Sequence, residues 1–162
     1  MNIQDDHPSI FFGPCVEESS DADEVPPFYA SLKIHDMTLH NAMLESGASH
    51  NLMPKVVMDQ LGLNITRPYK YIFSFDSRKV KCLGLIKYLV VSLSQIPAKN
   101  MVMDVVVVDI PPNFGMLLSS SWAAKLKGTL QMDMVYTTIP IFGQDRRLYR
   151  EVFLKYMVNN KS

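Results

Sequence analysis

Apolar and polar residues alternate along most of the chain from residue 28 onward. This alternation is typical of strands that bury one face. The first run has Phe28, Ala30, Leu32 and Ile34 on one side, and a polar turn at residues 35–36 leads into a second run, which predicts a hairpin. The pattern predicts strands over residues 28–34, 37–44, 69–75, 80–93, 101–110, 129–134 and 137–142.

Two short helical segments interrupt these strands. We expect a helix over residues 53–61, capped by Ser49 or Asn51 and ended by Gly62. A second helix is expected over residues 121–127, after a run of serines that can cap it. The chain is therefore predicted to be mainly β with two short helices.

Charge divides the chain into an acidic start and a basic remainder, although the formal net charge is zero. Seven of the 16 acidic residues lie in residues 1–27, which contain no Lys or Arg. We expect residues 1–27 to form an acidic, disordered leader, residues 28–143 a folded domain, and residues 144–162 a basic C-terminal linker. Within the leader, Phe11 and Phe12 form either a short binding motif or a local docking contact.

Several classes of protein are not expected from this sequence. Its most apolar stretch falls short of the roughly 18 apolar residues of a membrane span, and its start lacks the apolar segment of a secretory signal. Cys15 and Cys82 are far apart in the sequence, and no histidine pair has the spacing of metal ligands, so neither a metal nor a cofactor is expected. We expect an intracellular, cytoplasmic protein without a membrane partner.

One loop carries candidate chemistry. The strand over residues 37–44 runs directly into Glu45-Ser46-Gly47-Ala48-Ser49. A carboxylate is thereby presented at a tight loop, where a hydroxyl can bond to neighbouring backbone and glycine permits a close backbone approach.

This loop and its surroundings resemble the retroviral-type aspartic proteases (retropepsins), in the form found in gypsy-type polyproteins of plant long-terminal-repeat retrotransposons. The resemblance covers roughly residues 28–150. The family motif, an apolar residue followed by Asp-Ser/Thr-Gly-Ala-Ser/Thr, corresponds to residues 44–49. Residues 73–78 fall where the family has its flap hairpin, and residues 116–122 match its second motif, which ends at a tryptophan.

The resemblance implies a fold, a mechanism and a set of site residues. The fold is a closed barrel with a flap hairpin and two short helices, homodimeric in the family. Each chain supplies one carboxylate to a pair that activates water for hydrolysis of a peptide bond. The loop assigned to catalysis comprises Glu45, Ser46 and Gly47. An extended peptide or polyprotein substrate would contact Ala48, Ser49, Phe75, Asp76 and Ser77.

Two positions differ from the family pattern. Glu45 replaces the catalytic aspartate, and its extra methylene displaces the carboxylate by about 1.5 Å, the length of a C–C bond. A misplacement near 1 Å can cost roughly 100-fold in rate. Ser119 replaces a glycine that lies beneath the loop in the family.

These observations predict an aspartic endopeptidase domain for polyprotein processing that is weakened or inactive. One alternative is a non-catalytic remnant of the same fold that dimerises or binds peptides. Another is a nucleic-acid-binding β domain that uses the basic body, although nucleic acid is not the partner we expect.

Overall fold

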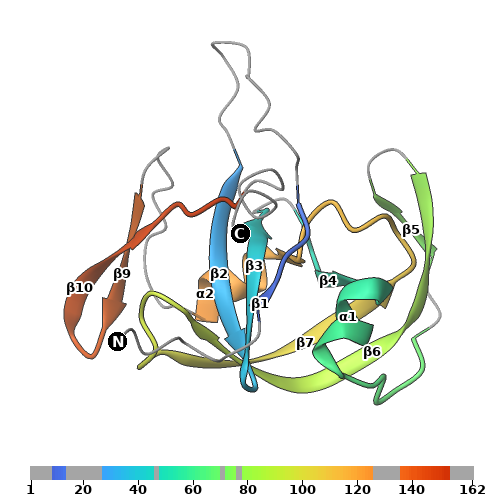
Figure 1. The fold of residues 1–162 in the computed structure, drawn as a ribbon, viewed down its shortest axis with the longest axis horizontal. Helices are drawn as coiled ribbons and strands as arrows, with labels where there is room; N and C mark the ends of the chain where they lie inside the picture. Colours follow the sequence, from blue (N-terminus) through green and yellow to red (C-terminus); the bar gives the residue numbers. More distant parts are fainter. Residues whose placement is uncertain are drawn as a thin grey trace, which may run out of the picture.

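The computed structural model of the 162-residue chain describes residues 9–13, 27–45, 48–69, 72–75, 78–125 and 136–153. The elements follow one another along the chain as shown in Figure 1. The strands are β1 (Ser9–Ile10), β2 (Phe28–Ile34), β3 (Met37–Leu44), β4 (Asn51–Pro54), β5 (Ile72–Phe75), β6 (Arg78–Leu93), β7 (Asn100–Val108), β8 (Met116–Leu118), β9 (Tyr136–Ile141) and β10 (Gln144–Tyr149). The helices are α1 (Lys55–Leu61) and α2 (Ser120–Lys125).

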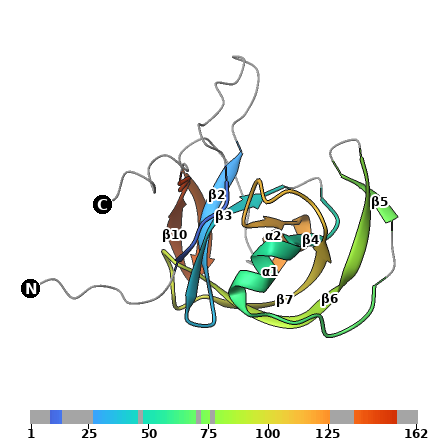
Figure 2. The same cartoon turned by 45° about the vertical axis from the view of Figure 1, so that its right-hand side comes forward.

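Six strands close into a barrel, as predicted. They are hydrogen-bonded in the order β3-β2-β6-β7-β4-β8, and β8 pairs in parallel with β3 to complete the ring. In Figures 1 and 2, the long strands β6 and β7 curve side by side, with β5 at one end of the molecule and β9 and β10 at the other.

The first hairpin of the barrel has the predicted bounds. β2 and β3 pair antiparallel around a turn at His35 and Asp36. The predicted pair of strands that would form the flap is also present, because β5 pairs antiparallel with the start of β6. The two residues at its tip, Asp76 and Ser77, lie outside the described residues.

The first helix is shorter than the sequence pattern predicts. Residues 51–54 belong instead to β4, which pairs in parallel with the buried end of β7. This tertiary pairing overrides the local helical pattern, so α1 begins only after Pro54 and has no side-chain cap. The predicted capping role of Asn51 is therefore wrong. Gly62 ends the helix as predicted, in the left-handed conformation with φ 69°.

Both ends of the described chain pack on the barrel. In the expected leader, Ser9 and Ile10 form β1, which pairs in parallel with β3, and the Ile10 side chain is buried in the main core. In the expected linker, residues 144–149 form β10, and Leu148 is fully buried.

The last hairpin of the described chain is one that the sequence pattern did not predict. β9 pairs with β10 around a turn at Phe142 and Gly143, where the sequence pattern paired residues 137–142 with residues 129–134. Leu148 of β10 is buried in the main core, while the other residues of this strand are exposed. Residues 129–134 lie outside the described residues.

The interior contains two hydrophobic clusters on opposite faces of the same strands. Along β7, Met103, Val105 and Val107 belong to the main core, whereas Val106 and Val108 belong to the second cluster. Both faces of this end of β7 are therefore buried, which explains its uninterrupted run of valines. The second cluster comprises Leu52, Val80, Cys82, Val106, Val108, Phe114 and Leu117.

Candidate functional site

Glu45 lies where β3 and β8 end together. The parallel ladder between these strands ends with Leu44 opposite Leu118. The backbone N–H of Glu45 then donates to the carbonyl oxygen of Leu118 at 2.9 Å, and its own carbonyl oxygen accepts from the N–H of Ala48 at 3.1 Å. The loop is therefore tight, and the exposed side chain of Glu45 projects from a backbone that β8 holds in place.

The second half of the loop is fastened to the start of α2. The carbonyl oxygen of Ala48 accepts from the N–H of Ser120 at 3.2 Å. Ala48 also packs against the second hydrophobic cluster, while Ser49 is exposed. The loop is thus held on one side by β8 and on the other by α2.

A buried polar network lies beneath this loop. The side-chain oxygen of Asn51 accepts from the N–H of Ser119 at 2.8 Å and from its hydroxyl at 3.0 Å. The side-chain nitrogen of Asn51 donates to the carbonyl oxygen of Asp104 on β7 at 3.0 Å. Asn51 therefore connects β4, β7 and the β8–α2 junction, a role that the sequence pattern did not indicate.

Ser119 fits the position where the retropepsin pattern has glycine. It is 0% exposed, and in addition to bonding with Asn51 its hydroxyl contacts the hydroxyl of Ser121 at 2.7 Å and accepts from the Ser121 N–H at 3.3 Å. The hydroxyl thus has partners, and it caps α2 as the serine run predicted.

The predicted site residues fall into three groups. Glu45, Ala48 and Ser49 lie together in one loop. Phe75 is the last residue of β5, on a separate hairpin. The remaining predicted residues lie outside the described part of the chain: Ser46, Gly47, Asp76 and Ser77.

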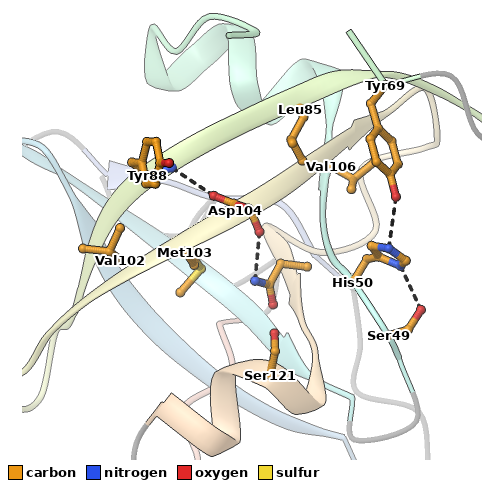
Figure 3. A pocket seen from close by; sticks show the side chains of 11 residues that line it. Ser49, His50, Tyr69, Leu85, Tyr88, Val102, Met103, Asp104, Val106 and Ser121 are labelled. Atoms are coloured by element: carbon orange, nitrogen blue, oxygen red, sulfur yellow. Dashed lines mark hydrogen bonds between the residues drawn. The ribbon is translucent and has the colours of Figure 1, made fainter. Parts of the chain in front are cut away.

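A pocket of about 510 Å³ adjoins the loop beyond Ser49 (Figure 3). At this end of the pocket, His50 bridges two hydroxyl groups: its Nδ1 lies 2.8 Å from the Ser49 hydroxyl and its Nε2 lies 3.1 Å from the Tyr69 hydroxyl. From there the pocket extends across β6 and β7. Its lining residues are Ser49, His50, Asn51, Tyr69, Leu85, Tyr88, Val102, Met103, Asp104, Val106 and Ser121.

The described residues contain no group of three or more His, Cys, Asp or Glu side chains that could hold a metal ion. The titratable group that the loop itself presents is the carboxylate of Glu45. Within the part of the chain that the structure covers, no helix is long and apolar enough to cross a membrane.

The same fold occurs in solved structures of retropepsin-like proteins. The retroviral protease-like domain of Ddi1 from Leishmania major superposes with a TM-score of 0.56 and 14% identity, over 78% of this chain and 95% of that one. A retropepsin-like aspartic protease from Rickettsia conorii gives 0.51 and 20%, over 67% and 85% of the two chains. EIAV protease complexed with the inhibitor HBY-793 gives 0.50 and 15%, over 71% and 100%.

Sequence comparison adds no closer relationship, because neither a protein-family model nor a curated protein matches this chain. At the low identities of the structural matches, the similarity establishes the fold: a mainly β, retropepsin-like closed barrel with two helices.

Proposed function

We propose that this chain is an aspartic endopeptidase domain that acts on an extended peptide, such as a plant gypsy-type retrotransposon polyprotein, with activity weakened by Glu45. The observation that carries the proposal is the position of Glu45. It follows β3 in a loop held by β8 and α2, within a fold that retropepsin-like proteases share.

The chemistry requires two carboxylates. One acts as a base toward the attacking water while the other, protonated, donates to the peptide carbonyl, and the two share one proton because like charges at such close range do not both ionise. The pair titrates as a unit. Since each chain supplies one Glu45 loop in this proposal, the functional form is a symmetric homodimer in which two such loops meet.

The hydrogen bonds of the loop explain why glutamate weakens this site. The backbone N–H of Glu45 is bonded to Leu118, which restrains this residue from moving back to offset the longer side chain. Its carboxylate stands about 1.5 Å further out than that of an aspartate on the same backbone. In a homodimer both carboxylates are displaced, and each displacement acts on the same water.

The test is to compare the wild type with Glu45→Asp and Glu45→Gln in cleavage of a peptide library. We expect kcat/KM to rise by roughly 100-fold in Glu45→Asp, the scale of a misplacement near 1 Å, and to vanish in Glu45→Gln. Glu151→Asp makes the same change on the C-terminal segment and serves as the matched control. Like Glu45, Glu151 has a backbone N–H that is hydrogen-bonded, in this case to the Tyr29 carbonyl oxygen. Equal cleavage by wild type and Glu45→Asp would refute the geometric argument.

The glutamate also favours a second candidate, a non-catalytic module that binds peptides or dimerises through the same fold. This candidate predicts saturable peptide binding without cleavage in both the wild type and Glu45→Asp. Analytical ultracentrifugation of the two proteins, alone and with peptide, measures dimerisation independently of hydrolysis.

A further inference from the structure

The pocket beside the Glu45 loop ends in an acidic and aromatic corner. Asp104 on β7 has a side chain that is 47% exposed, and Tyr88 on β6 is 69% exposed. Asp104 Oδ1 accepts a hydrogen bond from the Tyr88 N–H at 3.1 Å, as Figure 3 shows. A carboxylate and the face of an aromatic ring are the two groups that attract an organic cation.

Tyr88 is presented by strained backbone. It has φ 58°, an unusual conformation for a bulky residue, at a register shift between Ile86 and Leu89. The hydrogen bond to Asp104 supports this irregularity and leaves the ring on the surface. Backbone strain of this kind concentrates at functional sites.

The ammonium group of Lys87 lies at this corner. The Lys87 ammonium lies 3.9 Å from Asp104 Oδ2 and 5.1 Å from the centroid of the Tyr88 ring. The distance to the carboxylate exceeds the approximately 2.8 Å of a good charge-assisted hydrogen bond. The position of Lys87 therefore shows that the corner accommodates a cation. Because its contact with Asp104 is long, a cation with better geometry can displace the Lys87 ammonium.

The pocket connects this corner to the loop. Ser49 and His50 line one end, next to Ala48, while Tyr88 and Asp104 line the other. Between them lie the apolar Leu85 and Val106. A long basic side chain can lay its apolar stem along such a surface and keep its charged head at the far end.

We propose that this pocket binds an arginine side chain of an extended peptide that lies along the Glu45 loop. The guanidinium stacks on Tyr88 and bonds to Asp104 in place of Lys87, and the stem lies over Leu85 and Val106. This inference rests on the proposed function, because that function places a peptide at the loop. It adds that the protein selects peptides with an arginine at some distance from the peptide bond that is cleaved at Glu45.

The test uses fluorescein-labelled peptides in which one arginine is moved along an otherwise uncharged extended sequence. Peptides with citrulline, a neutral isostere, at the same positions are compared by fluorescence anisotropy. At one position arginine should bind about tenfold more tightly than citrulline, the scale of a hydrogen bond between charged groups. Asp104→Asn, which keeps an acceptor for the Tyr88 N–H, should abolish this preference. Lys87→Gln should strengthen arginine binding because it removes the internal competitor.

The controls come from a second lysine–aspartate pair, Lys55 and Asp59 on α1, which is also exposed and has an N–O distance of 2.9 Å. Lys55→Gln and Asp59→Asn should leave peptide binding unchanged. Absent or equal binding of arginine and citrulline peptides overturns the proposal, as does a preference that persists in Asp104→Asn. If Asp104→Asn does not fold, weaker or unchanged arginine binding by Lys87→Gln overturns it.

Cleavage is measured separately on the same peptides, so the two proposals fail in different ways. If arginine peptides bind selectively but neither the wild type nor Glu45→Asp cleaves any peptide, the arginine pocket is supported and the peptidase proposal is rejected. If Glu45→Asp cleaves peptides but binds arginine and citrulline peptides equally, the peptidase proposal is supported and the arginine pocket is rejected.

Discussion

Replacing Asn51 with leucine should loosen the loop that carries Glu45, although no atom of that loop is changed. Asn51 is 5% exposed and supplies the acceptor for two donors of Ser119 and the donor for the Asp104 carbonyl. Leucine branches at the same carbon as asparagine and is larger, so the substitution removes the hydrogen bonds without opening a cavity.

The cost can be estimated group by group. The Ser119 N–H, in a residue that is 0% exposed, loses its acceptor, which costs about 1–3 kcal/mol. The Ser119 hydroxyl keeps its contact with Ser121, so it contributes less. With the lost bond to Asp104 added, we expect a total near 3 kcal/mol, a large part of the roughly 5–15 kcal/mol that holds a domain folded.

Urea unfolding followed by circular dichroism measures this loss. With a slope of about 2 kcal/mol per molar urea, the midpoint should fall by about 1.5 M. The exposed Asn64 provides the matched control, because Asn64→Leu should change stability by less than about 0.5 kcal/mol. Hydrogen exchange at the Ser120 N–H, which bonds to Ala48, should accelerate in Asn51→Leu beyond its global destabilisation if the loop itself is loosened.

A double-mutant cycle with Ser119→Gly tests whether the pair acts as a unit. Ser119→Gly should cost about 1 kcal/mol less in the Asn51→Leu background than in the wild type, because the shared hydrogen bond is already absent. An equal cost in both backgrounds, or a loss below about 1 kcal/mol for Asn51→Leu, would show that the network does not support the loop.

Two further substitutions test the turn and the chain ends. Phe142 is 85% exposed at φ 50° and precedes Gly143 at φ 80°, a pair of conformations that an Asn-Gly turn favours. Phe142→Asn should therefore raise the free energy of unfolding by about 0.5–1 kcal/mol, measured by thermal unfolding. A lower melting temperature would contradict this. The buried Asn41 side chain bonds to the carbonyl of Phe12 and to both the N–H and the carbonyl of Phe153. Glycine tolerates the φ of 59° at this position. Asn41→Gly should therefore accelerate hydrogen exchange at the Phe153 N–H more than at the barrel strands. Uniform acceleration throughout the barrel would indicate global destabilisation instead.

The sequence was most informative where structure depends on near neighbours. The bounds of β2 and β3 agree with the alternation of apolar residues and with the turn between them, because a hairpin buries one face and its register follows from its turn. Gly62 was likewise predictable, since a left-handed helix end needs only the local backbone and a residue without Cβ.

Local pattern was misleading where a distant strand supplied the partner. The helix was predicted to begin at residue 53, yet residues 51–54 pair with the end of β7, whose burial on both faces outweighs the helical preference. Asn51 read as a cap, yet its side-chain partner Ser119 lies 68 positions away. At the ends of the chain, Ile10 and Leu148 are buried by elements remote in sequence.

The sequence by itself determined a mainly β domain, its first hairpin and a carboxylate in a tight loop after the second strand, because these follow from alternation, turn chemistry and one short motif. Only the tertiary structure decided which strands pair to close the barrel, that β8 and α2 hold the Glu45 loop, and that Ser119 fits beneath it by bonding to Asn51. It also decided that Tyr88 and Asp104 meet at one end of a pocket beside that loop. These features depend on which distant segments pair and which polar groups become buried together, and such long-range pairings leave no local pattern in the sequence.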